Sequence, residues 1–468
     1  MAAEDEFLFT VAKRAMLSSL ADPDAINYRQ QILGDCLRHP DVIRTIYRIA
    51  VDAIAGEKKI YRSIFYYPAA VLRRSVEALE FFVGMLKELR ALSDEHAEEF
   101  SSDGFTEFFR MLTKELGDEY FATINMHLKQ LRFRSGVLIS ADLGQGNKGT
   151  NYVLRKPRHE AKGWLRRITD KDHPSYSFTI ADRDDAGLRA LSELADRGVN
   201  LVANALAKST DHILSFFTLL RTELAFYIGC LNLHERLTGK GEPACFPVPH
   251  ALSATPTLNG SGLYDPCLSL TLPDHVVGND IAADGRSLVM ITGANEGGKS
   301  TFLRSVGLAQ LMTQCGMFVA ARSLHVVVCE GVFTHYKREE DATMHSGKLD
   351  EELSRMSTIV DQLNPNSVVL FNESFAATNE REGSEIARQI VHALLEKGIR
   401  VLFVTHLYDL AHGFYEQALP TALFLRAERH PDGRRTFALS AGEPAPTSYG
   451  EDLYRRVFGT TSDPGAVR

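Results

Sequence analysis

The segment from Leu288 to Gly316 combines patterns that restrict the fold of any chain that contains it. An apolar run, "LVMITG", is followed by a glycine-rich turn, "ANEGG", and then by the helical pattern "KSTFLRSVGLAQLMTQ". This order is typical of a strand, a tight loop and a helix that packs back on the strand. Such a unit belongs in a parallel sheet covered by helices, so it predicts an α/β fold.

The rest of the chain after residue 250 fits the same architecture. The short apolar runs "LHVVVCEGVF", "SVVLFNE" and "RVLFVTH" have the composition of buried parallel strands. Between the last two, "EREGSEIARQIVHALLEKG" has the spacing of an amphipathic helix. We therefore expect an α/β phosphate-loop NTPase domain, with a mostly parallel sheet, over residues 250–468.

The first half of the chain has helical patterns with one interruption. Residues 1–135 predict the first part of an all-α core and lever region, and residues 183–240 predict a long lever helix. A helix of roughly 40 residues would be ~60 Å long at ~1.5 Å per residue. Residues 136–182 combine short β-type runs with a Gly- and Asn-rich connection, which predicts a small basic β-type insertion.

Composition narrows the class of protein. The chain has 468 residues, of which 44% are apolar and 24% charged, as expected for a globular protein of two or three domains. No apolar run reaches the ~18 residues that span a bilayer, and the acidic N-terminus lacks the pattern of a secretory signal. Six scattered cysteines favour reduced thiols over a disulfide frame or a metal site. We expect a cytoplasmic protein without a membrane segment.

The glycine-rich turn has the residues of a phosphate-binding loop. Gly293, Gly297 and Gly298 allow backbone N–H groups to face phosphate oxygens, because no Cβ is in the way. Lys299 is placed to reach the β- and γ-phosphates, and the Ser300 hydroxyl to bind Mg²⁺. The sequence therefore predicts ATP and Mg²⁺ as cofactors.

Two further strand ends complete the predicted site. Asn372 and Glu373 end the strand "SVVLFNE", where an acid usually orders Mg²⁺ and an adjacent Glu orients the attacking water. Asn372 keeps an oxygen ligand but lacks the charge, so we expect weak Mg²⁺ binding and slow ATP hydrolysis. His406 follows "RVLFVT" and could contact the γ-phosphate, although a lone histidine is more often structural.

These motifs together resemble a known family. "VVGND", "ITGANEGGKSTFLRSVGLAQLMTQCGMFVAARS", "FNESFAATNEREG", "VTH" and "PTSYG" are closely similar to the MutS family of DNA mismatch repair ATPases. The resemblance is strong over roughly residues 250–460 and weaker over the helical first half. It implies an ATPase that forms a homodimer through its nucleotide domains and couples ATP state to a clamp around DNA.

The resemblance also implies roles for particular residues. "MHSGKLDEELSRM" occupies the place of the segment that reaches the partner's nucleotide, and Ser346 is the residue that matches this contact. The family's nucleotide-handling positions fall on Asn295, Lys299, Ser300, Thr301, Glu373 and His406.

Two of the sequence's departures from the family affect the expected function. The sequence begins at the lever region, so we expect the mismatch-reading and connector domains to be absent and the target to be an unusual DNA structure. Asn372 replaces the acid that orders magnesium. Mismatch recognition by base stacking is therefore not expected, whereas ATP binding is.

One segment could contact DNA. Residues 129–171 contain eleven Lys and Arg residues against three acids, a local charge of +8 in a chain of net charge −8. Basic side chains along a hairpin can neutralise DNA phosphates, and a tryptophan can stack on a base. A solvated basic face is the alternative interpretation. The candidates are Arg132, Arg134, Lys148, Arg155, Lys156, Arg158, Trp164, Arg166 and Arg167.

The leading hypothesis is a DNA-binding ATPase of the MutS type that acts in mismatch repair or on unusual DNA structures. The alternative is a nucleotide-state switch or scaffold that hydrolyses ATP weakly and acts on a protein partner. A transporter-type ATPase subunit is disfavoured, because the helical region shows no sign of a membrane partner.

Overall fold

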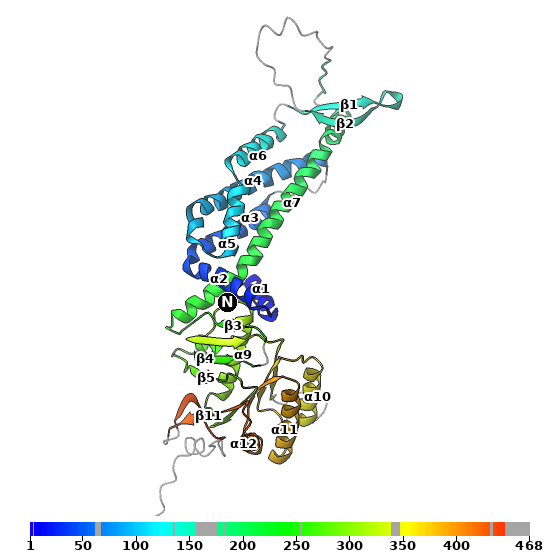
Figure 1. The fold of residues 1–468 in the computed structure, drawn as a ribbon. Coiled ribbons are helices and arrows are strands. Elements are labelled where there is room, and N and C mark those ends of the chain that lie inside the picture. The colour runs from blue at the N-terminus through cyan, green and yellow to red at the C-terminus, as the bar shows by residue number, and fades with distance from the viewer. Residues whose placement is uncertain are drawn as a thin grey trace, which may run out of the picture. The chain divides into compact units, whose positions relative to one another are not determined.

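A computed structural model shows the fold as two compact units (Figure 1). Unit 1 comprises Met1–Arg38, Ser102–Gly104 and Ala225–Arg468, and unit 2 comprises His39–Ser101 and Phe105–Leu224. The structure describes residues 1–2, 4–60, 67–133, 136–155, 176–181, 183–252, 255–337, 347–430 and 434–444.

The main sheet of unit 1 has six strands in the order β12-β11-β6-β10-β9-β8. Neighbouring strands are parallel, except that β11 and β12 are antiparallel. Residues 288–291, 368–371 and 401–404, in the central strands, are buried, as their apolar composition requires. The strands are β6 (Leu288–Gly293), β8 (Val332–Tyr336), β9 (Val368–Asn372), β10 (Arg400–Val404), β11 (Ala422–Arg429) and β12 (Arg435–Ala441).

Helices cover both faces of this sheet. Helices α10 (Lys348–Val360), α11 (Glu380–Glu396) and α12 (Tyr408–Glu416) share a core with alternate strand residues such as Phe371 and Phe403, whose rings stack 4.8 Å apart. Helix α9 (Lys299–Gln314) lies on the opposite face, where a Cβ on its Gly307 would come within 2.6 Å of Leu370.

A second sheet completes unit 1. Its four strands have the order β3-β7-β4-β5, and the short helix α8 (Pro266–Thr271) lies between β4 and β5 in the chain. The N-terminal helices α1 (Glu6–Leu17) and α2 (Pro23–Arg38) also belong to this unit, since Arg29 donates to the Cys315 carbonyl at 3.0 Å. The strands are β3 (Val248–His250), β4 (Leu258–Leu263), β5 (Asn279–Ala282) and β7 (Ser323–Val327).

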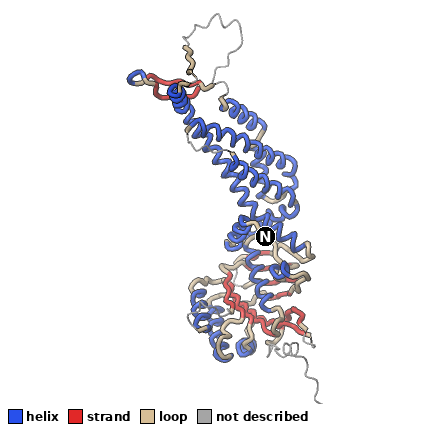
Figure 2. The backbone as a smooth tube through the Cα atoms, turned by 180° about the vertical axis from the view of Figure 1, so that it is seen from behind, coloured by secondary structure: helices blue, strands red, loops and turns tan. Residues whose placement is uncertain are grey.

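Among the described residues of unit 2, the regular structure is helical apart from one hairpin, which Figure 2 shows in red. The antiparallel hairpin consists of β1 (Leu138–Leu143) and β2 (Gly149–Arg155), joined through a turn of 3₁₀ helix (Gln145–Asn147). Phe82 and Phe217 are fully buried in the helical core, with ring centroids 5.7 Å apart. The helices are α3 (Pro40–Lys59), α4 (Pro68–His96), the 3₁₀ turn Ala97–Glu99, α5 (Asp103–Glu115) and α6 (Asp118–Leu131).

Helix α7 (Asp185–Thr238) has 54 residues and contributes residues to both units. Within the described residues it is the one helix long and apolar enough to cross a membrane by length and composition. Its best 18-residue window has a mean hydropathy of 1.4 and is 39% buried. A helix in the core of a water-soluble protein meets the same criteria, so this is weak evidence for a membrane span.

Two glycines in the helices of unit 2 provide a matched test of its packing. A Cβ on Gly56 of α3 would come within 2.2 Å of the Phe81 ring of α4, whereas a Cβ on the exposed Gly84 of α4 meets nothing within 4 Å. Gly56→Ala is expected to lower the free energy of unfolding by ~1–3 kcal/mol through overpacking. Gly84→Ala should raise it by ~0.5–1 kcal/mol, because alanine favours helix. Urea unfolding measures both, and equal stability of the two variants would contradict the packing of α3 on α4.

Candidate functional site

The carboxyl ends of three parallel strands meet at one edge of the main sheet. Val404 of β10 is paired with Ile291 of β6 on one side and with Asn372 of β9 on the other. The segments that follow these strands therefore lie next to one another. This register brings the glycine-rich loop, Glu373 and His406 into one site.

The glycine-rich loop has the backbone that its sequence predicts. Gly293 has φ 108°, and a Cβ there would lie 2.9 Å from the Ala427 amide nitrogen. Gly298 has φ 89° and directly precedes α9. Both conformations favour glycine. The loop places the positive end of a 16-residue helix at its centre, where an anion binds favourably.

Lys299 is buried beneath this loop. Its ammonium donates to the carbonyl oxygens of Gly293 at 3.0 Å and Ala294 at 2.9 Å. Burial lowers its pKa to about 8, against the opposing effect of the Glu373 carboxylate. The positive charge is thus held at the base of the loop, in reach of an anion that the loop amides would bind.

Ser300 and Asn372 form the part of the site that suits a magnesium ion. The Ser300 hydroxyl donates to the Asn372 side-chain oxygen at 2.7 Å. A hydroxyl and an amide oxygen are both ligands that Mg²⁺ accepts. The residues present therefore fit the predicted cofactor, with one negative charge fewer than an aspartate at residue 372 would provide.

Glu373 and His406 form the polar pair beside the loop. His406 Nε2 lies 2.9 Å from Glu373 Oε1, and this hydrogen bond is the main cause of the lowered pKa of Glu373. Glu373 has φ 54°, a backbone conformation that a non-glycine residue rarely adopts. Such strain is common at functional sites, where the surrounding structure holds it.

A pocket of about 340 Å³ opens next to these groups. Its polar side is the loop from Asn295 to Thr301 together with Glu373. Its apolar side includes Leu272, Val276, Val277 and Phe437. The pocket therefore joins a site for an anion to a surface for a flat apolar group.

Phe437 is the part of this pocket that the sequence did not indicate. It lies on β12, has φ 59° and leaves 48% of its surface exposed. Asn279 holds its backbone, donating to the Phe437 carbonyl at 3.1 Å and accepting from the Leu439 amide at 2.7 Å. The run "TFALS", which contains Phe437, has the composition of an ordinary strand. The motif "VVGND" contains Asn279 but does not indicate that Asn279 binds the Phe437 backbone.

The structure brings most of the predicted nucleotide residues together. Ser346 lies outside the described residues, so its predicted contact with a partner subunit stays a prediction. The predicted residues that line the pocket are Asn295, Gly297, Gly298, Lys299, Ser300, Thr301 and Glu373. The residues hydrogen-bonded to them are Gly293, Asn372 and His406.

Three of the DNA candidates are described, all in unit 2. Arg132 is paired with Glu80, its Nε donating at 2.9 Å, and this partner raises the pKa of the guanidinium. Arg155 donates to the Ser140 hydroxyl at 2.8 Å, and Lys148 is exposed at the hairpin turn. The other candidates, Arg134, Lys156, Arg158, Trp164, Arg166 and Arg167, lie outside the described residues.

Two family models match the chain. The model of the MutS2 N-terminal domain matches residues 21–240, and that of MutS domain V matches residues 289–452. The chain belongs to the MutS family. Domain V is the ATPase-type domain of this family, and it coincides with the sheet and loop described above.

Curated relatives agree with this assignment over part of their length. The chain is 33% identical over 178 residues to "DNA mismatch repair protein MutS" of Chloroflexus aurantiacus, covering 37% of this chain and 18% of that protein. It is 34% identical over 197 residues to "Endonuclease MutS2" of Shouchella clausii, covering 40% and 24%. It is 26% identical over 242 residues to "MutS protein homolog 4" of Homo sapiens, covering 51% and 25%. The matched part is thus a quarter or less of each relative.

Phe437 offers a direct test of the apolar side of the pocket. Phe437→Ala is expected to weaken the binding of ATP and ADP by the same factor, because it removes a stacking surface and no phosphate contact. An aromatic contact worth ~0.5–1.5 kcal/mol corresponds to a change of roughly 2- to 12-fold in the dissociation constant. Phe437→Tyr, which keeps the ring, should bind as the original protein does. Calorimetric titration measures these constants, and equal affinity of the Ala and Tyr variants would exclude a base at this position.

Proposed function

We propose that this MutS-family chain binds and hydrolyses ATP with Mg²⁺ and couples the nucleotide state to DNA binding. The observation that supports it best is the meeting of three groups at one sheet edge. These are the Lys299 ammonium under the loop, the Ser300–Asn372 hydrogen bond and the Glu373–His406 pair. Each of these groups suits one part of a nucleotide-hydrolysing site.

The loop and pocket would hold the nucleotide. Loop amides and the N-terminus of α9 would bind the phosphates, with Lys299 at the β- and γ-phosphates. The base would stack on Phe437 in the pocket that Phe437, Val276 and Val277 line. This division explains why the polar and apolar surfaces of the pocket adjoin.

Hydrolysis would depend on Glu373. Its lowered pKa keeps the carboxylate ionised at neutral pH, so it can accept a hydrogen bond from the water that attacks the γ-phosphorus. His406 would hold the carboxylate in place and lie near the γ-phosphate. Mg²⁺ would neutralise phosphate charge beside Ser300 and Asn372, and the neutral Asn372 would make turnover slow.

The DNA part of the proposal has support from sequence and family. Lys148 and Arg155 on the hairpin could neutralise phosphates without reading base sequence. Arg132 is a poorer candidate, since Glu80 already binds its guanidinium. We further propose a cytoplasmic homodimer that joins through its ATPase domains, with Ser346 at the partner's nucleotide, as the family resemblance implies.

A nucleotide-state switch that acts on a protein partner is the second candidate function. The observation that favours it is the neutral Asn372 beside Ser300, since a site with slow hydrolysis would stay in its ATP state for long periods.

Glu373→Gln separates binding from hydrolysis. The amide keeps the size of the side chain but accepts a hydrogen bond from water less strongly, so ATP turnover should fall by about 10²–10⁴-fold. ATP affinity should change by less than about threefold, because the phosphate contacts remain. The matched control is Glu396→Gln, at an exposed position near the end of α11. Equal turnover by the two variants would refute hydrolysis at this site.

The same assay tests the DNA part when it is run with duplex, mismatched and branched DNA over a salt series. Stimulation or inhibition of ATP turnover that weakens with salt supports DNA coupling. If none of the three DNAs changes the rate of ATP turnover, even at low salt, the DNA part is refuted and the protein-partner switch is the remaining candidate function.

A further inference from the structure

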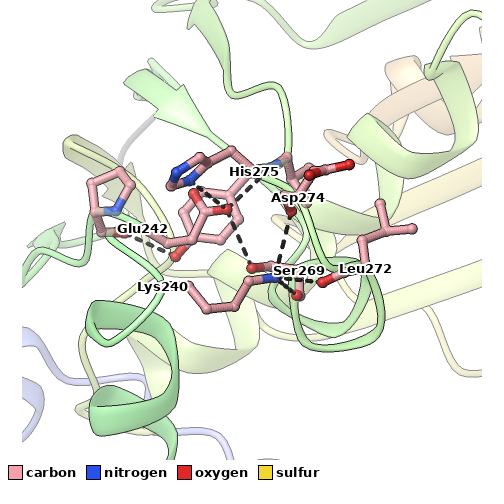
Figure 3. Close-up of polar contacts among 9 residues, drawn as sticks. Lys240, Glu242, Ser269, Leu272, Asp274 and His275 are labelled. Atoms are coloured by element: carbon pink, nitrogen blue, oxygen red, sulfur yellow. Dashed lines mark hydrogen bonds and ion pairs between the residues drawn. The ribbon is translucent and has the colours of Figure 1, made fainter.

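One wall of the pocket is a loop without secondary structure of its own. Leu272, His275, Val276 and Val277 line the pocket and lie between the end of α8 and the start of β5. A loop of this kind keeps its shape only if groups outside it satisfy its backbone. Those groups come from the segment that follows helix α7, in the same unit (Figure 3).

Lys240 supplies the positive group. Its ammonium donates to three backbone carbonyl oxygens, those of Ser269, Leu272 (2.6 Å) and Asp274 (3.4 Å). Ser269 is in the last turn of α8, where helix carbonyls have no partner within the helix. A lysine at the negative end of a helix, bound to three carbonyls, fixes both that helix end and the loop that leaves it.

Glu242 supplies the negative group. Its carboxylate is buried and accepts from the Val276 amide at 3.0 Å and from the Ser269 hydroxyl at 3.4 Å. His275 Nδ1 lies 3.5 Å from the same oxygen. Val276 is a residue of the pocket wall, so the carboxylate holds the wall directly by its backbone.

A tight turn places these two residues on the same loop. The chain leaves α7 with Gly241 at φ 74°, and the Glu242 amide donates back to the Leu237 carbonyl at 3.1 Å. Both side chains therefore bind the backbone of one segment, Ser269–Val276: Lys240 donates to its carbonyls, and Glu242 accepts from one of its amides. The charges match the polarity of the backbone groups they meet.

We propose that Lys240 and Glu242 are positioning residues for the nucleotide: they hold the Leu272–Val277 wall so that it can contact the base and ribose. The inference rests on the proposed binding of ATP in this pocket. Neither residue lies at the phosphates, so both act on affinity and base selectivity and leave the hydrolysis step itself unchanged. They also make the turn that follows α7 part of the support of the nucleotide pocket.

Lys240→Met tests the proposal, with Lys397→Met as the control at an exposed position that ends another helix, α11. The dissociation constants for ATP and ADP should both rise by roughly tenfold, since the lost wall contacts are common to the two nucleotides. Discrimination between ATP and GTP should decrease. Turnover at saturating ATP should stay within about twofold of the original value. A contact that stabilises bound ATP and the transition state equally changes the dissociation constant and leaves the saturated rate unchanged.

Lys240→Arg should restore most of the affinity, because its guanidinium can donate to the same carbonyls. Glu242→Gln is the second variant and keeps the shape of the buried side chain; its dissociation constants should rise by about threefold or more. If Lys240→Met does not fold, Glu242→Gln decides the question, and unchanged dissociation constants in that folded variant would refute the proposal.

The outcomes separate this inference from the proposed function. An original protein that binds no nucleotide refutes ATP binding itself. An original protein that binds ATP, with folded variants that bind it equally well, refutes only the positioning role. A fall in saturated turnover without a change in the dissociation constants would also overturn it.

Discussion

The parallel register of β6, β10 and β9 is the constraint on which the site depends. Because Val404 pairs with Ile291 on one side and Asn372 on the other, three chain segments far apart in sequence end at the same level. This register is what brings the glycine loop, the Asn372–Glu373 strand end and His406 together. The sheet sets the positions of these segments, and hydrogen bonds between side chains, such as Ser300 to Asn372, then fix the orientation of the side chains.

The strained turn after β9 is held by buried polar groups behind it. Glu373 and Phe375 both have positive φ, 54° and 63°. The buried Glu352 carboxylate of α10 accepts from the Phe375 amide at 2.8 Å, and burial raises the pKa of Glu352. The Ser374 hydroxyl donates to the His335 carbonyl at 2.6 Å. These contacts offset the strain and keep the Glu373 side chain directed at the loop.

Local patterns were enough to predict which residues meet at the end of the sheet, but not what surrounds them. The α/β fold, the glycine loop and the positions of Asn372, Glu373 and His406 follow from short runs in which strand, turn and helix signals are contiguous. The MutS family assignment is confirmed by the matches to two of its domains. The roles of the individual site residues stay predictions until the variants are measured.

Features that depend on long-range contacts could not be read from such runs. Helices α1 and α2 have the same periodicity as the helices of unit 2, yet they belong to unit 1 through contacts such as Arg29 to Cys315. Phe437 has an ordinary strand context, and only the fold shows that it faces the pocket. The pairing of Arg132, a DNA candidate, with Glu80 could not be predicted, because Glu80 is distant in sequence.

Magnesium dependence tests the central claim, that Ser300 and Asn372 form the metal part of an ATP-hydrolysing site. The measurement is ATP turnover as a function of Mg²⁺ concentration for the original protein, Asn372→Asp and the control Asn364→Asp, whose residue is exposed before the same strand. An added carboxylate charge near the cation should lower the half-maximal Mg²⁺ concentration by roughly tenfold or more in Asn372→Asp and raise turnover. Identical Mg²⁺ curves for Asn372→Asp and Asn364→Asp would contradict the claim.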